Sequence, residues 1–322
     1  MEKEKKNEEA LVLCSMGNRC LVTPFQGSPY VAYLKGNVRL EGIRSTSPVV
    51  VGDRVEISFS RDRHQTAMIE KILPRRNYLI RRATNLSRES QILAANIDQA
   101  LLLVTLASPV TTTTFIDRFL ATAEAYSIPV SLLFNKIDLY NEEERIELNR
   151  LSSIYESIGY PIFYLSATTG GGCEAIKVLL KDKITLLAGH SGVGKSTLTN
   201  QLIAGTLRET QPLNEMHGTG RHTTTLAEMI PLGSTPQEGY LIDSPGIKGF
   251  GTIEMDETNL GHYFREFFEI SKQCRFYNCR HLNEPNCAVI NAVEEGKIAP
   301  SRYKSYLSIL EDSEAGKYRP PQ

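Results

Sequence analysis

The spacing of apolar residues divides the chain into three parts. Between residues 11 and 73, apolar residues occur in short runs that glycine-containing turns separate. These runs cover residues 18–25, 29–35, 37–42, 53–60 and 66–73. Short runs enriched in β-branched and aromatic residues predict strands. About five strands in roughly sixty residues are typical of a small barrel such as an OB-fold.

A second pattern begins near residue 100, where apolar runs alternate with helical stretches at 115–126 and 142–157. The apolar runs cover residues 100–107, 130–136, 163–167, 184–189 and 239–243. Buried parallel strands have continuous apolar runs, and their alternation with helices predicts a doubly wound, mostly parallel α/β sheet. After residue 251 the pattern predicts a third, helical region that contains three of the six cysteines.

Charge is balanced over the 322 residues, with a formal net charge of -1, but it is not evenly spread. Residues 11–82 contain twelve Lys and Arg against five Asp and Glu. A basic barrel face favours nucleic-acid binding, although a basic surface that is merely solvated remains an alternative. The charged N-terminus lacks the apolar core of a signal peptide, and no apolar run is long enough to cross a bilayer. We therefore expect a cytoplasmic protein without a membrane segment.

Residues 189–196, GHSGVGKS, match the phosphate-loop pattern G-x-x-x-x-G-K-[ST]. They follow a predicted strand and precede a predicted helix, as the mechanism requires. Glycines let backbone N–H groups converge on phosphate oxygens, and the helix N-terminus adds positive potential. Lys195 is expected to reach the β- and γ-phosphates, with the Ser196 hydroxyl on Mg²⁺.

A second motif, NKID at residues 135–138, ends an apolar strand. In an N-x-x-D motif of this kind the aspartate, here Asp138, accepts hydrogen bonds from guanine N1–H and its amino group. Adenine lacks those donors, so the motif predicts selectivity for guanine. Ser166 and Ala167 end the next strand and fit the small-residue loop that contacts the guanine carbonyl.

Further residues are expected to bind Mg²⁺ and to contact the γ-phosphate. Asp243 and Gly246 form a D-x-x-G motif, in which the aspartate orients Mg²⁺ through water and the glycine N–H senses the γ-phosphate. A threonine between the phosphate loop and this motif should complete the metal shell; Thr224 is the first candidate and Thr223 the second.

The position that holds a water-orienting glutamine in Ras-like GTPases is occupied by Ile247. Isoleucine cannot hydrogen-bond water, so hydrolysis is either very slow or uses another group. His222 is our candidate, while a packing or partner-contact role for this histidine remains open.

The guanine motif precedes the phosphate loop by more than fifty residues, whereas GTPases usually begin with the phosphate loop. This order predicts a circularly permuted sheet, a rearrangement that is tolerated where loops and termini lie at the surface.

Cys274, Cys279, His281 and Cys287 form a C-x4-C-x-H-x5-C cluster. Three thiolates and one imidazole make a complete tetrahedral set, which predicts one structural zinc ion. A set of buried free cysteines is the alternative. The remaining Cys14, Cys20 and Cys173 have no such companions, and we expect them to pack in the interior.

Permuted GTPase motifs with a basic barrel before them and this cysteine cluster after them closely resemble the ribosome-small-subunit-dependent GTPases of bacteria, the RsgA (YjeQ) family. The resemblance covers residues 12–311. It implies an OB-fold barrel and action in late maturation of the small ribosomal subunit. It also implies rRNA binding, slow GTP hydrolysis that the subunit accelerates, release on hydrolysis, and a catalytic role for His222. Lys248 and Gly249 depart from the family pattern, which puts contacts of the second switch in doubt.

The sequence thus predicts a multidomain α/β protein that acts as a monomer. Its parts are a flexible N-terminus (1–10), an OB-fold RNA-binding domain (11–80), a circularly permuted P-loop GTPase domain (81–251), and a helical zinc-binding domain with a C-terminal helix and tail (252–322).

The predicted ligands of this protein are GTP and GDP with Mg²⁺, one Zn²⁺, and the small ribosomal subunit with its rRNA. The candidate catalytic residues are His222, Lys195 and Thr224. The predicted nucleotide and magnesium site comprises Asn135, Lys136, Ile137, Asp138, Ser166, Ala167, Gly189, His190, Ser191, Gly192, Val193, Gly194, Lys195, Ser196, Thr197, Thr224, Asp243 and Gly246. A nucleotide-gated RNA-binding module with negligible hydrolysis and a P-loop phosphotransferase remain alternatives; the guanine and D-x-x-G motifs argue against the latter.

Overall fold

The computed structural model describes residues 8–24, 27–35, 48–59, 66–82, 90–203, 227–233, 235–243 and 259–315. The chain forms two compact units, each built from discontinuous segments. The first unit contains residues 1–101, 167–188 and 195–249, and the second contains residues 102–166, 189–194 and 250–322. No helix among the described residues is long and apolar enough to cross a bilayer.

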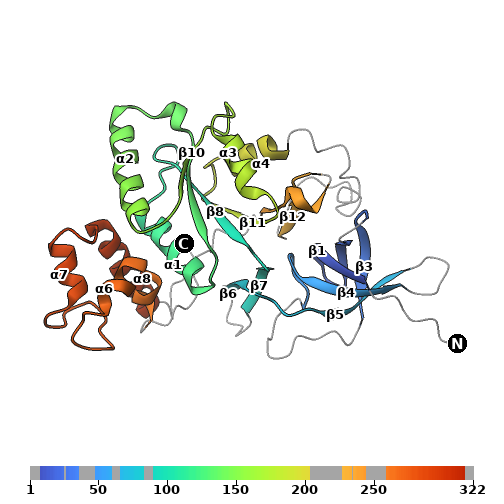
Figure 1. Cartoon of the computed structure of the whole chain (residues 1–322), viewed down its shortest axis with the longest axis horizontal. Coiled ribbons are helices and arrows are strands. Elements are labelled where there is room, and N and C mark those ends of the chain that lie inside the picture. Colours follow the sequence, from blue (N-terminus) through green and yellow to red (C-terminus); the bar gives the residue numbers. More distant parts are fainter. Residues whose placement is uncertain are drawn as a thin grey trace. The chain divides into compact units, whose positions relative to one another are not determined.

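Five strands of the first unit form the predicted barrel (Figure 1). They are β1 (Glu8–Met16), β2 (Arg19–Pro24), β3 (Tyr30–Leu34), β4 (Arg54–Phe59) and β5 (Ala67–Ile72). The strands are paired in the order β1-β2-β3-β5-β4, and β1 also pairs with β4, which closes the barrel. Only the β3–β5 pairing is parallel. The predicted five-stranded barrel is thus confirmed, with β2, β3, β4 and β5 at predicted positions and β1 as an unpredicted strand.

The barrel core follows from the two-residue period of its strands. Every second residue points inward, so β1 contributes Ala10 and Val12, and β4 contributes Val55 and Ile57. A bulge between Val12 and Cys14 breaks the β1–β2 register, and beyond it Cys14 pairs with Glu228 of β12 (Glu228–Pro231). Bulges bend and twist a strand, so β1 can belong to the barrel and to the neighbouring sheet.

The rest of the first unit contains five further paired strands among its described residues. β11 (Ile184–Ala188) pairs in parallel with β13 (Tyr240–Asp243), and β13 pairs with β12 in antiparallel fashion. β6 (Tyr78–Arg82) and β7 (Ser90–Ala95) form a separate antiparallel pair. Among the described residues of this unit, the helices are α3 (Cys173–Leu180) and α4 (Lys195–Ile203), and the short η2 is a 3-10 turn (Pro236–Glu238).

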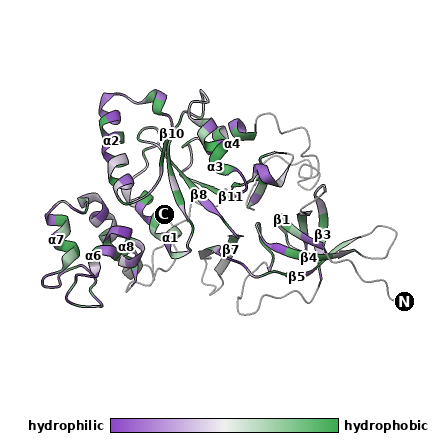
Figure 2. Cartoon of the chain, in the orientation of Figure 1, coloured by the Kyte–Doolittle hydropathy of each residue, from purple (hydrophilic) through white to green (hydrophobic). Residues whose placement is uncertain are grey.

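The second unit carries the other parallel strands. β8 (Gln99–Val104) enters it from the first unit, and β9 (Val130–Phe134) pairs in parallel with β10 (Ile162–Tyr164). Helix α1 (Thr113–Ala125) begins at the Thr112 cap, whose hydroxyl accepts from the Phe115 N–H. Helix α2 (Glu142–Ser157) begins with a capping box between Asn141 and Glu144. Figure 2 shows hydrophilic residues along much of α2, as expected of a helix that buries one stripe.

The C-terminal helices of the second unit surround their own apolar cluster. They are η4 (Leu260–Tyr263), α6 (Arg265–Ser271), α7 (Ala288–Glu294) and α8 (Pro300–Ala315). α8 packs along α1, and Ala121 of α1 belongs to the same buried cluster as Leu260, Ile309 and Leu310. This region is therefore anchored on helix α1.

The structure differs from the sequence prediction at four strands. β1 begins at Glu8, within the segment assigned to a flexible N-terminus, and it was absent from the predicted strands. The β6–β7 pair and the four-residue β12 were not predicted either. The predicted strand at 37–42 lies outside the described residues. The three-domain division itself stays a prediction.

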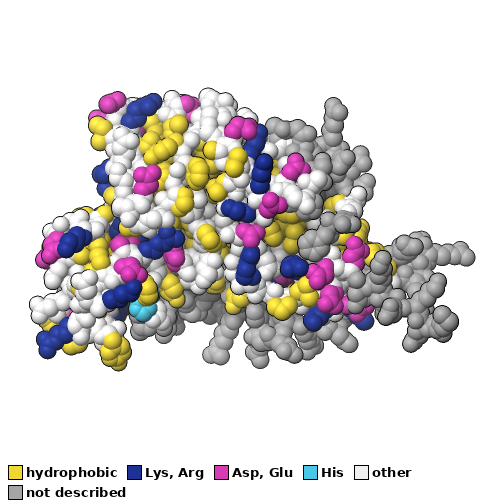
Figure 3. All heavy atoms as spheres, viewed as in Figure 1, with side chains coloured by type: hydrophobic (Ala, Val, Ile, Leu, Met, Phe, Trp, Pro, Cys, Tyr) yellow, Lys and Arg dark blue, Asp and Glu magenta, His cyan; other side chains and the backbone are white. Residues whose placement is uncertain are grey.

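Several basic residues in and directly after the described barrel strands form ion pairs. Lys35 pairs with Glu70, Arg54 with Glu9 and Arg76 with Asp98, all at or near the surface. Figure 3 shows basic and acidic side chains interspersed over the described atoms of the face in view. A strongly basic surface is therefore not seen among the described barrel residues.

One ion pair of the barrel is buried. Arg75 donates through Nε and a terminal nitrogen to the two carboxylate oxygens of Asp53, at 2.6 and 2.7 Å, and also to the Pro48 carbonyl. The side chains are 5% and 0% exposed. Asp53 also accepts the Val50 N–H, so this pair joins the turn before β4 to the segment after β5.

We predict that Arg75→Ala destabilises the protein by about 3–5 kcal/mol, because Asp53 would remain buried without its cation. The matched control is Arg54→Ala, which removes an arginine from an exposed pair whose side chains are 51% and 46% accessible, and which should change the free energy of unfolding by less than about 1 kcal/mol. Urea unfolding of the full chain measures both values. Equal losses for the two variants would contradict this ranking.

Candidate nucleotide-binding site and metal centre

The predicted phosphate loop lies between β11 and α4 and turns through glycines with positive φ. Gly189 has φ +141°, and a Cβ there would lie 2.8 Å from the Leu103 carbonyl oxygen. Gly194 has φ +101°, and a Cβ there would lie 2.4 Å from Nδ2 of Asn135. Side chains are therefore excluded at both positions, by backbone conformation and by close contact.

The guanine motif holds this loop directly. Nδ2 of Asn135 donates to the Val193 carbonyl at 2.8 Å, and Asn135 is only 1% exposed. Lys136 has a left-handed backbone, and its ammonium donates to the carbonyls of Gly192 and Ser108 at 2.8 and 2.6 Å. The two predicted motifs thus meet in the folded chain, where the side chains of Asn135 and Lys136 bind carbonyls of the phosphate loop.

Asp138 is placed differently from these two residues. It lies in η1 (Ile137–Leu139), a 3-10 turn directly after the loop contacts, and it is exposed. The Ile137 N–H donates to the Leu165 carbonyl, which brings the end of β10 beside the motif. Ser166 and Ala167 follow and are buried. An exposed carboxylate beside a phosphate loop can accept the two donors of a guanine edge.

The segment 105–112 and Tyr140 also shape the site, and sequence analysis missed both. The Tyr140 hydroxyl donates to the Asn135 carbonyl at 2.7 Å and accepts the Leu106 N–H at 3.0 Å. Burial raises the pKa of Tyr140 to about 12, so the hydroxyl remains a donor. Near the start of α1, the Phe115 ring lies 3.6 Å from the His190 ring, centroid to centroid. No motif signals these contacts, because they join residues that are distant in sequence.

The remaining predicted residues divide into two groups. Lys195, Ser196 and Thr197 form the first turn of α4, and Asp243 ends β13. The others lie outside the described residues: Thr223, Thr224, His222, Gly246, Ile247, Lys248 and Gly249.

Cys274, Cys279, His281 and Cys287 come together at one point of the second unit, with ligand atoms within 4.8 Å of one another. The Cys279 and Cys287 sulfurs are 3.6 Å apart, and the Cys274 and Cys287 sulfurs are 4.0 Å apart. Nδ1 of His281 lies 3.4 Å from the Cys287 sulfur. A tetrahedral zinc ion with ordinary bond lengths would separate two sulfurs by roughly 3.8 Å and a sulfur from a nitrogen by roughly 3.6 Å. The residues therefore fit a four-coordinate metal ion.

Neighbouring residues fix the shape of this cluster. The hydroxyls of Tyr303 and Tyr306 on α8 donate to the carbonyls of His281 and Arg280, at 2.8 and 2.6 Å. The Glu284 carboxylate accepts backbone N–H groups of the same loop. Burial alone would raise the pKa of Glu284, but these donors lower it. Hydrogen bonds to the residues around a metal site, such as these, orient the metal ligands.

Burial of the cluster disfavours charged ligands in the absence of a cation. It raises the pKa of Cys279 to about 12 and that of Cys287 above its usual value, and it lowers that of His281. The three cysteines outside the cluster, Cys14, Cys20 and Cys173, are all buried, as expected.

The fold and the site together define a circularly permuted P-loop GTPase, in which the guanine motif precedes the phosphate loop that it contacts. A family model of RsgA GTPases matches residues 72–253. The chain belongs to this family and is an enzyme that hydrolyses GTP.

Similar proteins cover almost the whole chain. The Small ribosomal subunit biogenesis GTPase RsgA of Porphyromonas gingivalis is 55% identical over 97% of this chain and 99% of its own length. The protein of the same name from Bacteroides fragilis is 53% identical with the same coverage. The crystal structure of YjeQ from Thermotoga maritima has a TM-score of 0.76 at 34% identity, covering 97% of this chain and 100% of its own. YloQ, described as a circularly permuted GTPase, has a TM-score of 0.73 at 26% identity, with 99% of each chain covered.

We predict that Gly194→Ala weakens GTP and GDP binding by about tenfold or more, because the new methyl group would displace the Asn135 amide from Val193. The matched control is Gly296→Ala. Gly296 also has a positive φ, +73°, but a Cβ there meets nothing within 4 Å, so this variant carries only the backbone strain. Titration with a fluorescent guanine nucleotide compares the two. Equal affinities for the two variants would show that the Asn135 contact does not hold the loop.

Proposed function

We propose that this GTPase acts in maturation of the small ribosomal subunit, binds the subunit and its rRNA, is stimulated by it, and leaves after hydrolysis. The observation that carries the proposal is the contact of Asn135 and Lys136 with the phosphate loop, which assembles a guanine-nucleotide site. The names of the full-length relatives supply the small subunit as the partner. With that partner the protein would work in the cytoplasm.

Within this proposal each predicted site residue has a role. Asp138 selects guanine and the Ser166–Ala167 backbone contacts its carbonyl. Lys195 and Ser196 bind the β- and γ-phosphates and Mg²⁺, and Thr224 and Asp243 complete the metal shell. Gly246 senses the γ-phosphate. His222 replaces the missing glutamine and orients the attacking water.

The metal-bearing loop offers one surface for rRNA. Tyr277 is 100% exposed, and Phe276 next to it is 40% exposed. The Arg275 guanidinium lies over the Phe276 ring at 5.4 Å, and the Lys272 ammonium lies over Phe268 at 5.0 Å. Aromatic rings accompanied by cations stack unpaired bases and neutralise phosphates. A fully exposed tyrosine beside a second partly exposed ring suits that contact.

We predict that purified small ribosomal subunits raise the rate of GTP hydrolysis at least about tenfold, because docking would order groups that intrinsic catalysis lacks. Single-turnover assays with and without subunits measure this effect. Tyr277→Ala should reduce the stimulation by raising the subunit concentration needed for half of it, with intrinsic hydrolysis unchanged. His222→Ala in the same assay should lower turnover more than GTP affinity.

Large ribosomal subunits at matched concentration are the control for non-specific effects of RNA. Failure of small subunits to accelerate hydrolysis, with GTP binding intact, would favour the second candidate, a nucleotide-gated RNA-binding module. The observation behind this candidate is Ile247 in place of the glutamine.

We further propose that the Cys274, Cys279, His281 and Cys287 cluster holds one structural zinc ion, because its set of ligands leaves no position open for substrate. We predict one equivalent of zinc in the purified chain. Cys287→Ser should lose most of it and lower the Tm by several degrees. Cys173→Ser, which changes a buried cysteine outside the cluster, should keep its zinc. Elemental analysis and thermal unfolding test this pair; a different metal in the wild type would refute the assignment.

A further inference from the structure

Helix α1 contacts the phosphate loop at one end and the metal-bearing region along its length. Near its start, the Phe115 and His190 rings are 3.6 Å apart at an interplanar angle of 32°. His190 is the second residue of the phosphate loop. Phe115 is thus a side chain through which α1 touches the loop that binds phosphates.

The middle of α1 is joined to α8 by a buried ionic network. Asp117, 0% exposed, accepts from a terminal nitrogen of Arg302 at 2.6 Å and from the Tyr155 hydroxyl at 2.8 Å. Arg302 is itself 1% exposed and donates twice to Glu266 of α6, at 2.7 and 3.0 Å. One buried guanidinium therefore joins three helices, α1, α6 and α8.

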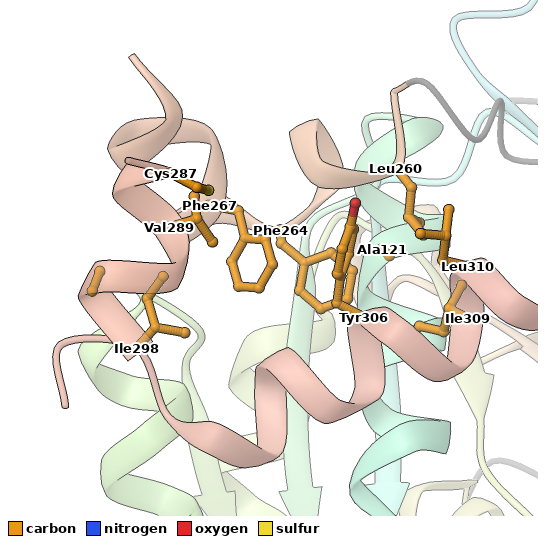
Figure 4. Close-up of a cluster of buried hydrophobic side chains, with 11 residues drawn as sticks. Ala121, Leu260, Phe264, Phe267, Cys287, Val289, Ile298, Tyr306, Ile309 and Leu310 are labelled. Carbon is orange, nitrogen blue, oxygen red and sulfur yellow. The ribbon is translucent and has the colours of Figure 1, made fainter. Parts of the chain in front are cut away.

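Two further contacts of α1 reinforce this attachment. Ala121 packs with Leu260, Ile309 and Leu310 (Figure 4). Near the end of α1, Glu124 accepts from Nε of Arg265 at 2.6 Å. Contacts spread along the helix fix its rotation relative to α6 and α8 as well as its distance from them.

α8 continues the path to the metal ligands. Arg302, Tyr303 and Tyr306 lie within five residues on this helix, and the two tyrosine hydroxyls donate to backbone carbonyls of the metal-bearing loop. Helices α1 and α8 therefore connect two contacts, the one with His190 of the phosphate loop and the one with the carbonyl of the ligand His281.

We propose that α1 couples nucleotide binding to the C-terminal region, with Phe115 as the positioning residue at the phosphate loop. A nucleotide that orders the loop orders His190, and the ring contact extends this order to α1 and α8. By reciprocity of linked binding, a well-ordered C-terminal region also strengthens nucleotide binding. The proposal requires guanine-nucleotide binding but not the ribosomal partner.

Hydrogen exchange of the full-length, metal-containing chain tests this coupling. We expect saturating GDP to slow exchange of the α8 amides about fivefold or more in the wild type, the lower end of typical coupling. In Phe115→Leu this protection should largely disappear, while exchange of α8 without nucleotide stays the same. GDP is added at saturation for each variant, as confirmed by titration, so a change in affinity alone does not alter the result.

The matched control is Phe119→Leu, the same substitution one turn later on α1, at a residue that is 1% exposed. It should loosen the helix at least as much as Phe115→Leu, yet retain protection by GDP. Loss of protection in both variants would show a general loosening of α1 and overturn the role of Phe115. Absence of protection in the wild type, with GDP bound, would overturn the coupling itself, and absence of GDP binding would instead refute the guanine-nucleotide site.

A second measurement follows the metal-bearing loop. The rate at which a chromophoric chelator removes zinc from the zinc-loaded chain should fall by a similar factor on GDP binding in the wild type and Phe119→Leu, but not in Phe115→Leu. Equal rates with and without GDP in the wild type would limit the coupling to α8 and overturn its extension to the metal ligands.

Discussion

The hydrogen bond from the Asn135 amide to the Val193 carbonyl joins two motifs that are 58 residues apart in the order opposite to that of most GTPases. It is buried, and the glycine at 194 leaves room for it. The Lys136 ammonium adds two bonds from the next residue. Because these bonds are made in space, the order of the motifs along the chain does not matter to the site. The permuted order is therefore compatible with an ordinary phosphate loop.

The C-terminal helices are attached to α1 by buried ion pairs as well as by apolar packing. Arg302 faces two carboxylates, Asp117 and Glu266, so the buried group carries an excess negative charge when both are ionised. Burial raises the pKa of Asp117, and the Arg302 guanidinium opposes that rise. A buried ion pair contributes little net stability compared with a well-packed apolar contact, but breaking one is costly. Loss of any one partner would leave a buried charge uncompensated, so the network favours the arrangement of α1, α6 and α8 in which all of its bonds form.

The sequence predicted those features that short, local patterns encode. The helix at 142–157 matches α2 because its capping residues and its buried stripe are both local. The phosphate loop, the guanine motif and the metal cluster were likewise recognised from spacing alone. β1 escaped notice because residues 10–14 are all buried, owing to its two sets of partners, so it lacks the alternation of a strand with one wet face. β12 has only four residues, too few for a period. The contacts of Phe115, Asp117 and Tyr140 depend on tertiary packing, for which no local pattern exists.

The metal cluster and α8 also depend on each other. The loop from Cys274 to Cys287 contains no helix or strand, so little besides ligands and side-chain contacts can hold its backbone. A metal ion would fix four side chains, and the two tyrosine hydroxyls of α8 fix carbonyls of the residue that supplies the imidazole and of the residue before it. These hydroxyls reach their acceptors with the loop in the shape in which the four ligand atoms converge. Metal binding and the docking of α8 are therefore expected to occur together. The position of α8 is then fixed by its contacts with α1 and by its contacts with the metal-bearing loop.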